Sequence, residues 1–376
     1  MKISIITVLN TINYGSVLQT YATQKYLSDM GFDTEFVDFS RKDQKYGQIV
    51  KKTIFSKRNN LKQMIKKPIK DALDIISLGK SYRVFRGFLN RNIKMSKISY
   101  GSFEELVVNP PLADIYCTGS DQMWNSFWNN GIEKSFFLDY AQEKPRIAFC
   151  TSIGMTEFPI KDKEILLRLI KKYSFISVRE KSAELLLKKY GISAYTAMDP
   201  TLLIEGCFWK KMATKRSAPR PYLLVYQLHY DKHQGVVFNE AVRKIAESFG
   251  LDIIRITYSI SDIQLGKKIV LPKVEEFISL FANADYVITD SFHGTAFSVN
   301  LNRPFSVIYP EQFSTRIECL LQLIGMEERK LSDINQIIGL ERDISFDKVN
   351  EILKNKREEC KHIFRERLKT VCLEKE

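Results

Sequence analysis

The chain has 376 residues, more than one ordinary hydrophobic core accommodates, so two domains are expected. Hydrophobic residues make up 44% of the sequence and charged residues 27%, the balance of a folded globular protein, and no low-complexity tract or fixed-period repeat occurs. The sequence contains no run of about eighteen apolar residues, so no membrane-spanning helix is expected.

The N-terminus and the cysteines indicate a cytoplasmic protein. The first residues read MKISIITVLNTINYGS, and their apolar run is too short for a signal-peptide core but suits a buried first strand. The cysteines are scattered without CxxC spacing, at positions 117, 150, 207, 319, 360 and 372. Reduced and mostly buried thiols are therefore expected.

The chain begins with the pattern of a doubly wound parallel sheet. A strand is predicted at residues 3–9, a helix at 16–30 from its apolar spacing, and a second strand at 34–39. Further along the first half, strands are predicted at 113–117, 146–150 and 175–178, and helices at 161–172 and 180–190. Residues 201–220, with their lysines and prolines, are expected to connect this half to the next.

A second alternating series follows. Its predicted strands are 222–227, 252–257, 285–289 and 305–309, and its predicted helices are 234–249, 273–283, 294–300, 314–324 and a charged helix at 347–371. The fold class expected is α/β, with two Rossmann-like domains at 1–205 and 206–346 facing across a cleft, followed by a C-terminal helix at 347–376. In such folds, ligands bind beyond the carboxyl ends of the strands.

The net charge of +13 is concentrated in one segment. Residues 41–97 hold 17 lysines and arginines but only three aspartates, so the rest of the chain is close to neutral. Helices are predicted at 61–78 and 81–92, with breaks at Pro68 and Gly79. Apolar residues at helical spacing suit an interfacial helix on an anionic membrane, and they equally suit a solvated basic face packed on the N-terminal domain. Nucleic acid is not expected, because no reading motif accompanies the charge.

The most informative local sequence surrounds His293. An apolar strand ends in Thr289-Asp290-Ser291, and a helix is predicted to start near Gly294. Unpaired N–H groups and the dipole at a helix N-terminus favour anions, and histidine adds a group that titrates near neutral pH. An ordinary helix cap by Asp290 or Ser291 is the alternative.

Three other polar turns also follow predicted strands. Arg179 opens a helix and could bind a phosphate or carboxylate, or could pair with Glu180 or another nearby carboxylate. The segment from Gly119 to Asn125 carries hydroxyl-binding side chains and Trp124, which could stack on a sugar or could simply be packed. The turn at residues 13–16 is a helix cap or a ligand contact. No HExxH, P-loop or GxSxG motif occurs, and His229 and His233 do not make a convincing metal site, so no metal is expected.

Five segments together resemble the polysaccharide pyruvyl transferase family. They read NYGSVLQTYA at 13–22, TGSDQMWN at 118–125, SVRE at 177–180, DPTLL at 199–203 and ADYVITDSFHGTAFSVNLNRPF at 284–305. Their order and spacing cover nearly the whole chain except the basic segment. The resemblance implies a fold similar to GT-B glycosyltransferases, phosphoenolpyruvate as donor, and a pair of sugar hydroxyls as acceptor. The product would be a pyruvate ketal on a surface or capsular polysaccharide precursor of a bacterium.

The resemblance also implies roles for individual residues. Arg179 and His293 match the arginine and histidine that hold the donor in studied members. Some members carry another arginine two residues before this histidine, where the present chain has Ser291. Arg303, Arg316 or lysines across the cleft are candidates to replace it. The donor-binding residues predicted are Arg179, Ser291, His293, Gly294, Thr295 and Arg303, and the acceptor-binding residues are Asn13, Tyr14, Gly15, Ser120, Gln122 and Trp124.

The chemistry implied needs an acid and a base. His293 is expected to contact the phosphate and to donate a proton, and either Asp121 or Asp290 to act as base toward the acceptor hydroxyl. The first domain would hold the acceptor, free or lipid-linked, and the second the donor. Phosphoenolpyruvate would be a co-substrate, with no further cofactor. A cytoplasmic enzyme in peripheral contact with the inner face of the membrane is expected.

Two other functions are compatible with the sequence. A GT-B-type glycosyltransferase would use a sugar nucleotide and ignore phosphoenolpyruvate. A non-catalytic carbohydrate-binding protein would release no phosphate with any donor.

Overall fold

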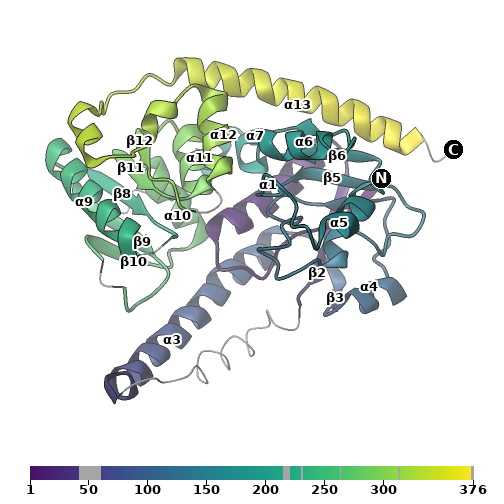
Figure 1. Ribbon diagram of the computed structural model, residues 1–376, viewed down its shortest axis with the longest axis horizontal. Coiled ribbons are helices and arrows are strands. Elements are labelled where there is room, and N and C mark those ends of the chain that lie inside the picture. The colour runs from purple at the N-terminus through teal and green to yellow at the C-terminus, as the bar shows by residue number, and fades with distance from the viewer. Residues whose placement is uncertain (42–60, 215–220, 230–231, 263, 312–313, 374–376) are drawn as a thin grey trace.

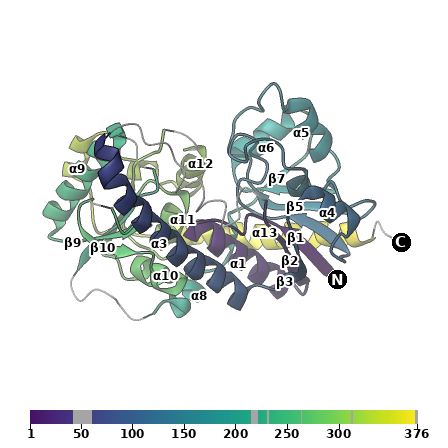
Figure 2. The ribbon, with the colours of Figure 1, turned by 90° about the horizontal axis from the view of Figure 1, so that it is seen from below.

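The computed structural model describes residues 1–41, 61–214, 221–229, 232–262, 264–311 and 314–373. In these ranges the chain forms two parallel β-sheets, each flanked by helices (Figures 1 and 2). The predicted α/β class with two Rossmann-like units is confirmed.

The first sheet has the strand order β3-β2-β1-β4-β5-β6-β7. Its strands are β1 (Lys2–Ile6), β2 (Asp33–Phe39), β3 (Met95–Tyr100), β4 (Ile115–Thr118), β5 (Arg146–Thr151), β6 (Phe175–Val178) and β7 (Tyr195–Thr196). The register pairs Ile3 with Ile115 and Ile6 with Thr118. The chain winds outward from β1 on one side and from β4 on the other. The carboxyl ends of β1 and β4 therefore form a topological switch point, where α/β proteins bind ligands.

The second sheet repeats this arrangement with the order β10-β9-β8-β11-β12. Its strands are β8 (Tyr222–Tyr226), β9 (Asp252–Thr257), β10 (Lys267–Val270), β11 (Tyr286–Thr289) and β12 (Phe305–Val307). Tyr226 pairs with Thr289 at the carboxyl ends of β8 and β11. The switch point of this sheet therefore lies just before the segment that contains His293.

Helices connect the strands and close the chain. They are α1 (Tyr14–Asp29), α3 (Leu61–Asn92), α4 (Phe103–Val108), α5 (Lys163–Ile170), α6 (Lys181–Lys188), α7 (Pro200–Leu203), α8 (Gly206–Met212), α9 (Lys232–Phe249), α10 (Val274–Ala282), α11 (Phe292–Asn300), α12 (Thr315–Ile324) and α13 (Asp347–Leu373). Short 3₁₀ turns occur at Lys134–Phe137, Glu327–Arg329 and Ile334–Gly339. None of the helices in the described ranges is long and apolar enough to cross a lipid bilayer.

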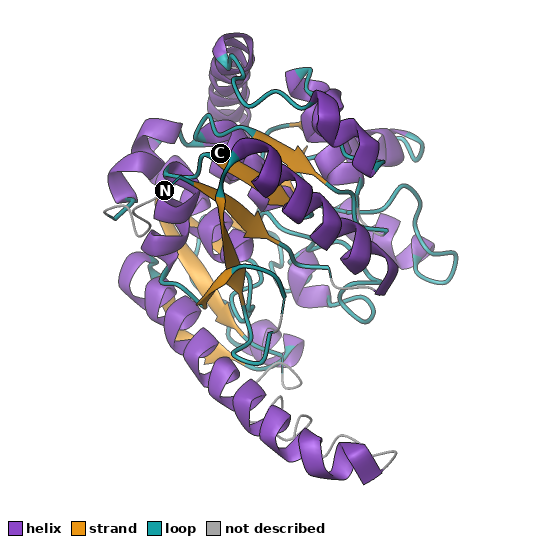
Figure 3. Ribbon diagram, turned by 90° about the vertical axis from the view of Figure 1, so that its left-hand side faces the viewer, coloured by secondary structure: helices purple, strands orange, loops and turns teal. Residues whose placement is uncertain are grey.

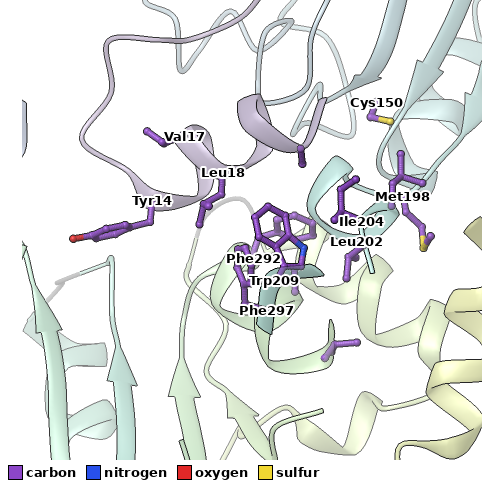
Figure 4. Packing of buried hydrophobic residues seen from close by; sticks show 14 of the residues in the cluster. Tyr14, Val17, Leu18, Cys150, Met198, Leu202, Ile204, Trp209, Phe292 and Phe297 are labelled. Atoms are coloured by element: carbon purple, nitrogen blue, oxygen red, sulfur yellow. The ribbon is translucent and has the colours of Figure 1, made fainter. Parts of the chain in front are cut away.

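Apolar side chains join the two domains. Tyr14 of α1 stacks on Phe277 of α10, with ring centroids 4.2 Å apart, and its hydroxyl donates to the carbonyl of Pro272. Trp209 of α8 lies edge-on to Phe297 of α11 at 5.3 Å. Trp209 also lies edge-on to Tyr21 of α1 in the first domain, at 6.2 Å. These side chains belong to one continuous buried cluster that includes residues of both sheets (Figure 4). The contact between the domains is therefore hydrophobic and fixes the cleft.

The long helix α3 corrects the predicted breaks at Pro68 and Gly79. The backbone is helical without interruption from Leu61 to Asn92 (Figures 1 and 3). A helix-interior glycine costs only about 1 kcal/mol, and the buried side chains of Phe85, Phe88 and Leu89 offset that cost. Residues 42–60 of the predicted basic segment lie outside the described residues.

The placement of α3 also differs from a basic face packed on the N-terminal domain alone. Ser77 accepts a hydrogen bond from the backbone N–H of Ile260, and Nζ of Lys80 donates to the carbonyl of Val270. Both partners belong to the second domain. The helix therefore braces one domain against the other.

Three strands and three helices, among them α4 after β3, were not predicted. Strands β3 and β10 are half-exposed edge strands, β7 has only two residues, and none carries an apolar alternation. Helices α7 and α8 occupy residues that were expected to form a connector. This part of the expected connector is helical because Trp209 packs on Tyr21 of α1 and donates to the carbonyl of Thr201, whereas residues 215–220 lie outside the described residues.

Candidate active site

A cavity of about 750 Å³ lies between the two domains. Its walls come from the segments after β1 and β4, from those after β8, β9 and β11, and from the start of α12. The side chains that line it include Asn13, Ser16, Asp121, Gln122, Trp128, His229, Asp290, Ser291, Phe292, His293 and Arg316. Its volume is within the range of about 300–1,000 Å³ typical of small-molecule sites. Both switch points open into this cavity, which makes it the candidate active site.

His293 lies in the first turn of α11, against the first turn of α1. A Cβ atom added to Gly15 would lie 2.0 Å from Nδ1 of His293, so only glycine lets α1 come this close to the ring. Nε2 of His293 is buried, lies 3.7 Å from Oδ2 of Asp199, and has no hydrogen-bond partner among the described residues. Packing against α1 therefore holds the imidazole at the domain boundary, and Nε2 is left able to form a hydrogen bond with a ligand.

The residues next to His293 build the turn that presents it. Ser291 lines the cavity and caps α11, accepting a hydrogen bond from the N–H of Gly294. A Cβ on Gly294 would lie 2.3 Å from Oγ1 of Thr289, so this glycine lets α11 pack on β11. Thr295 is fully buried, and its hydroxyl donates to the carbonyl of Ser291. Gly294 and Thr295 thus support the turn and do not line the cavity.

Arg179 follows β6, and its side chain is 0% exposed. Its Nη1 donates to Oδ2 of Asp199 at 2.8 Å and to Oγ of Ser120 at 3.2 Å. Its Nη2 lies 3.5 Å from Oδ1 of Asp121, and its Nε lies 3.8 Å from Oε2 of Glu180. Neither Nε nor Nη2 donates a hydrogen bond within the described part of the chain. The sequence did not decide which carboxylate pairs with Arg179. In the structure its nearest carboxylate is that of Asp199.

Asp199 lies between Arg179 and His293, a position that the sequence alone did not indicate. Burial alone would raise the pKa of its carboxyl, but His293, Arg179 and Thr201 together hold that pKa well below its usual range. Asp199 is the N-cap residue of α7, and its Oδ1 accepts hydrogen bonds from the backbone N–H and the hydroxyl of Thr201. Its appearance in the segment DPTLL, shared with the family, was the signal that could have identified it.

Asp121 stands where the turn after β4 meets the start of α1. Its backbone is left-handed, with φ of 85°, and Oγ of Ser16 donates to its Oδ2 at 2.5 Å. Burial opposes ionisation, but Arg179, the Ser16 hydrogen bond and His293 lower the pKa of Asp121 below its ordinary value. Asp121 is therefore a carboxylate at neutral pH and is able to accept a proton.

Asp290 differs from Asp121 although both line the cavity. It accepts hydrogen bonds from the backbone N–H groups of Leu228 and His229 at 2.7 and 2.9 Å. Burial outweighs these contacts and raises the pKa of Asp290 to about 7. Among the carboxyls that line the cavity, Asp121 is ionised and Asp290 exchanges a proton near neutral pH, and such a pairing suits acid–base chemistry.

Arg316, in the first turn of α12, lies close to this group. Its guanidinium lies 5.7 Å from the centre of the Phe292 ring, and that of Arg179 lies 5.2 Å from the same ring. Burial, followed by the nearby charge of Arg179, lowers the pKa of Arg316 to about 10, so it remains a cation. Nε of Arg316 is buried without a hydrogen-bond partner in the described ranges. The two arginines and Phe292 also line an adjoining cavity of about 540 Å³.

Arg303 lies at the opposite end of the second sheet. Its Nε donates to the carbonyl of Leu301 and its Nη1 to that of Ala284. These residues precede β12 and β11, whereas the cavity lies after the carboxyl ends of the strands. The prediction that Arg303 binds the donor is therefore wrong.

Four residues predicted to bind the acceptor do not line the cavity. Trp124 is fully buried and stacks on Phe137 at 5.9 Å. Tyr14 is buried in the contact between the domains, and Gly15 faces His293. Ser120 is buried behind Arg179, to which its hydroxyl oxygen is bonded. Of the predicted set, Asn13 and Gln122 line the cavity. Trp128, which the sequence analysis passed over, lines it as well.

A known protein family accounts for most of the length of the chain. The family model for polysaccharide pyruvyl transferase matches residues 13–312. The chain belongs to the polysaccharide pyruvyl transferase family. The match begins at Asn13 of the first turn and includes Asp121, Arg179, Asp199 and His293. No curated protein matches the chain in sequence.

Solved structures show the same fold at low sequence identity. The MnaA–UDP co-structure from S. aureus has a TM-score of 0.51 at 10% identity, with 90% of this chain and 86% of that chain covered. The α,α-trehalose 6-phosphate synthase from Burkholderia multivorans also has a TM-score of 0.51, at 8% identity, with 100% and 99% covered. The pyruvyl transferase chain therefore has a GT-B-like fold.

Proposed function

We propose that this pyruvyl transferase moves the pyruvyl group of phosphoenolpyruvate to two hydroxyls of a sugar, forming a ketal on a polysaccharide precursor. The observation that carries the proposal is the convergence of Arg179, Arg316 and His293 around Phe292. Phosphoenolpyruvate has a phosphate and a carboxylate, so it needs two cationic contacts, and each arginine has donors without a hydrogen-bond partner in the described ranges.

Arg316 takes the part of the arginine that is absent at Ser291. It reaches the same ring from α12, whereas Arg179 reaches it from the first domain. Arg179 is charge-balanced by Asp199 in the structure as it stands. The donor therefore accepts hydrogen bonds from Nε and Nη2 of Arg179, which have no other hydrogen-bond acceptor in the described ranges. Nε2 of His293 donates to the phosphate.

The reaction is a substitution without redox change. A proton adds to the methylene carbon of phosphoenolpyruvate, and one sugar hydroxyl bonds to the adjacent carbon as it loses its own proton. The bond from that carbon to the phosphate oxygen breaks, and its electron pair leaves with phosphate. The second hydroxyl then bonds to the same carbon and closes the ketal ring, and its proton goes to the departing phosphate. Asp121, ionised, accepts the hydroxyl proton, and Asp290 or His293 supplies the proton for carbon. The proposal needs no cofactor besides the co-substrate.

The acceptor approaches from the side of the first domain, as a free or lipid-linked glycan. We place the enzyme in the cytoplasm, at the inner face of the membrane, with the basic residues of 41–97 facing anionic lipid. Sedimentation with anionic vesicles at low salt tests this contact, and a protein that stays in the supernatant excludes it.

Product analysis tests the reaction directly. The protein is incubated with phosphoenolpyruvate or UDP-sugars and a panel of glycans, and released phosphate and glycan mass are measured. The expected result is phosphate release with a glycan mass gain of one pyruvate less water. Glycosyl transfer from UDP-sugars would establish the glycosyltransferase instead. Glycan binding without transfer from either donor would establish a carbohydrate-binding protein.

A further inference from the structure

Trp128 stands at the active-site cavity on the side of the first domain. Its side chain lines the cavity, yet the residue is 59% exposed. The other two tryptophans of the chain, Trp124 and Trp209, are fully buried. A tryptophan that is both exposed and part of a cleft wall offers a rigid, flat aromatic face to a ligand in that cleft.

The loop that carries Trp128 is anchored by buried amides. Its backbone N–H donates to Oδ1 of Asn125, whose Nδ2 donates to Oε1 of Gln122. Nδ2 of Asn129 donates to the carbonyls of Gln122 and Met123. These amides fix the backbone on both sides of Trp128. The indole is therefore presented by an ordered loop, which lowers the entropy lost when a ligand binds.

The surroundings of Trp128 indicate a ligand with one apolar face and a polar edge. Ile12, also partly exposed, adds an apolar contact to the cavity wall, whereas Asn13, Asp121 and Gln122 add polar groups. Phosphoenolpyruvate is small and carries only anionic groups, and the proposed function assigns it to the arginines around Phe292. A pyranose has C–H groups on one face and hydroxyls on its edge, and it matches this wall. An aromatic ring is the usual partner of such a face because it is large, rigid and partly polar.

We infer that Trp128 is the stacking platform for the acceptor sugar, with Asp121 and Gln122 facing the sugar's hydroxyls. This inference rests on the proposed function, because it takes the acceptor to be a sugar. It assigns to Trp128 the role that burial denies to Trp124. It also places acceptor recognition on the first domain, opposite Arg316 and His293 of the second.

Fluorescence quenching tests the inference without turnover. Acrylamide reaches Trp128 but not the two buried tryptophans, so quenching reports on Trp128. The probes are the methyl glycosides of glucose, galactose, mannose and N-acetylglucosamine, each titrated to its solubility limit. We expect at least one to protect the fluorescence saturably, and phosphoenolpyruvate not to. Absence of protection by all four sugars would overturn the inference.

Variants then separate a stacking role from a structural one. Trp128→Ala is expected to raise the acceptor KM about tenfold, equivalent to about 1.4 kcal/mol, and to leave the KM for phosphoenolpyruvate unchanged. Trp128→Phe should recover most of the loss. Phe127→Ala is the matched control, because Phe127 is 67% exposed on the same loop but does not line the cavity. An unchanged acceptor KM in Trp128→Ala would refute the inference and leave the pyruvyl transfer intact. Sugar protection without pyruvyl transfer would refute the proposed function and leave the sugar site intact.

Discussion

The contact between Gly15 and His293 leads to the sharpest prediction. In Gly15→Ala, the new Cβ would lie 2.0 Å from Nδ1 and 2.3 Å from Cγ of the imidazole. Comfortable contacts between heavy atoms begin near 3.5 Å, so the ring or the helix must move by about 1.5 Å. A misplacement of about 1 Å at a reacting group costs on the order of 10²-fold in rate. We expect kcat to fall by at least that factor.

The assay is phosphate release from phosphoenolpyruvate in the presence of an acceptor, with thermal unfolding measured in parallel. Gly87→Ala is the matched control. Gly87 lies inside α3, and its nearest neighbour to a new Cβ is the flexible end of Arg91 at 3.5 Å. This control should keep full activity and gain up to about 1 kcal/mol of stability. A Gly15→Ala enzyme with wild-type kcat would refute the claim that α1 positions the imidazole.

Three further predictions follow from the charged groups. Arg316→Ala should raise the KM for phosphoenolpyruvate by about 10- to 100-fold, the loss of one charged hydrogen bond, whereas Arg303→Ala should leave it unchanged; equal effects in initial-rate measurements would contradict the assignment. Asp199→Asn leaves the buried Arg179 without its main carboxylate and should lower the free energy of unfolding by about 3 kcal/mol in urea denaturation, and unaltered stability would exclude that pairing. The pKa of Asp290 is raised by burial to about 7, so its stabilising effect is complete below the unfolded pKa of about 4 and is lost as the pH rises through about 7. Relative to Asp290→Asn, the wild type should therefore lose stability over that pH window, and parallel stability profiles would count against a protonated Asp290.

Strong local patterns made most of the fold predictable. The buried strands and amphipathic helices carry apolar periodicities that follow from which face meets the core. Edge strands such as β10 have no such pattern, because both faces of the strand are partly exposed to solvent. The continuity of helix α3 was not predicted. Its C-terminal part packs on both domains, and this packing outweighs the helix-breaking tendency of Gly79.

The site was predictable where a residue follows a strand, and less so where packing decides. Asp121, Arg179, Asp290 and His293 all stand at strand carboxyl ends, which sequence patterns locate. Trp124 is buried and Trp128 is exposed because of the way one loop folds over the core. The two residues are only four positions apart, and the sequence does not show which of them faces the cavity. Arg316 lines the cavity because of where α12 packs, and no local sequence pattern indicates that packing.

The helix α13 bears on how the protein is made. Phe364 is fully buried, and its ring lies 4.7 Å from that of Phe149 in β5 and 6.0 Å from that of Tyr26 in α1. Arg357 reaches the carbonyl of Leu202 in the first domain and Oδ1 of Asn300 in the second. The interior of the first domain is thus completed by a helix that follows the whole second domain in the chain. A nascent chain cannot finish the first domain until α13 has been synthesised, so the two domains and the site between them are completed together.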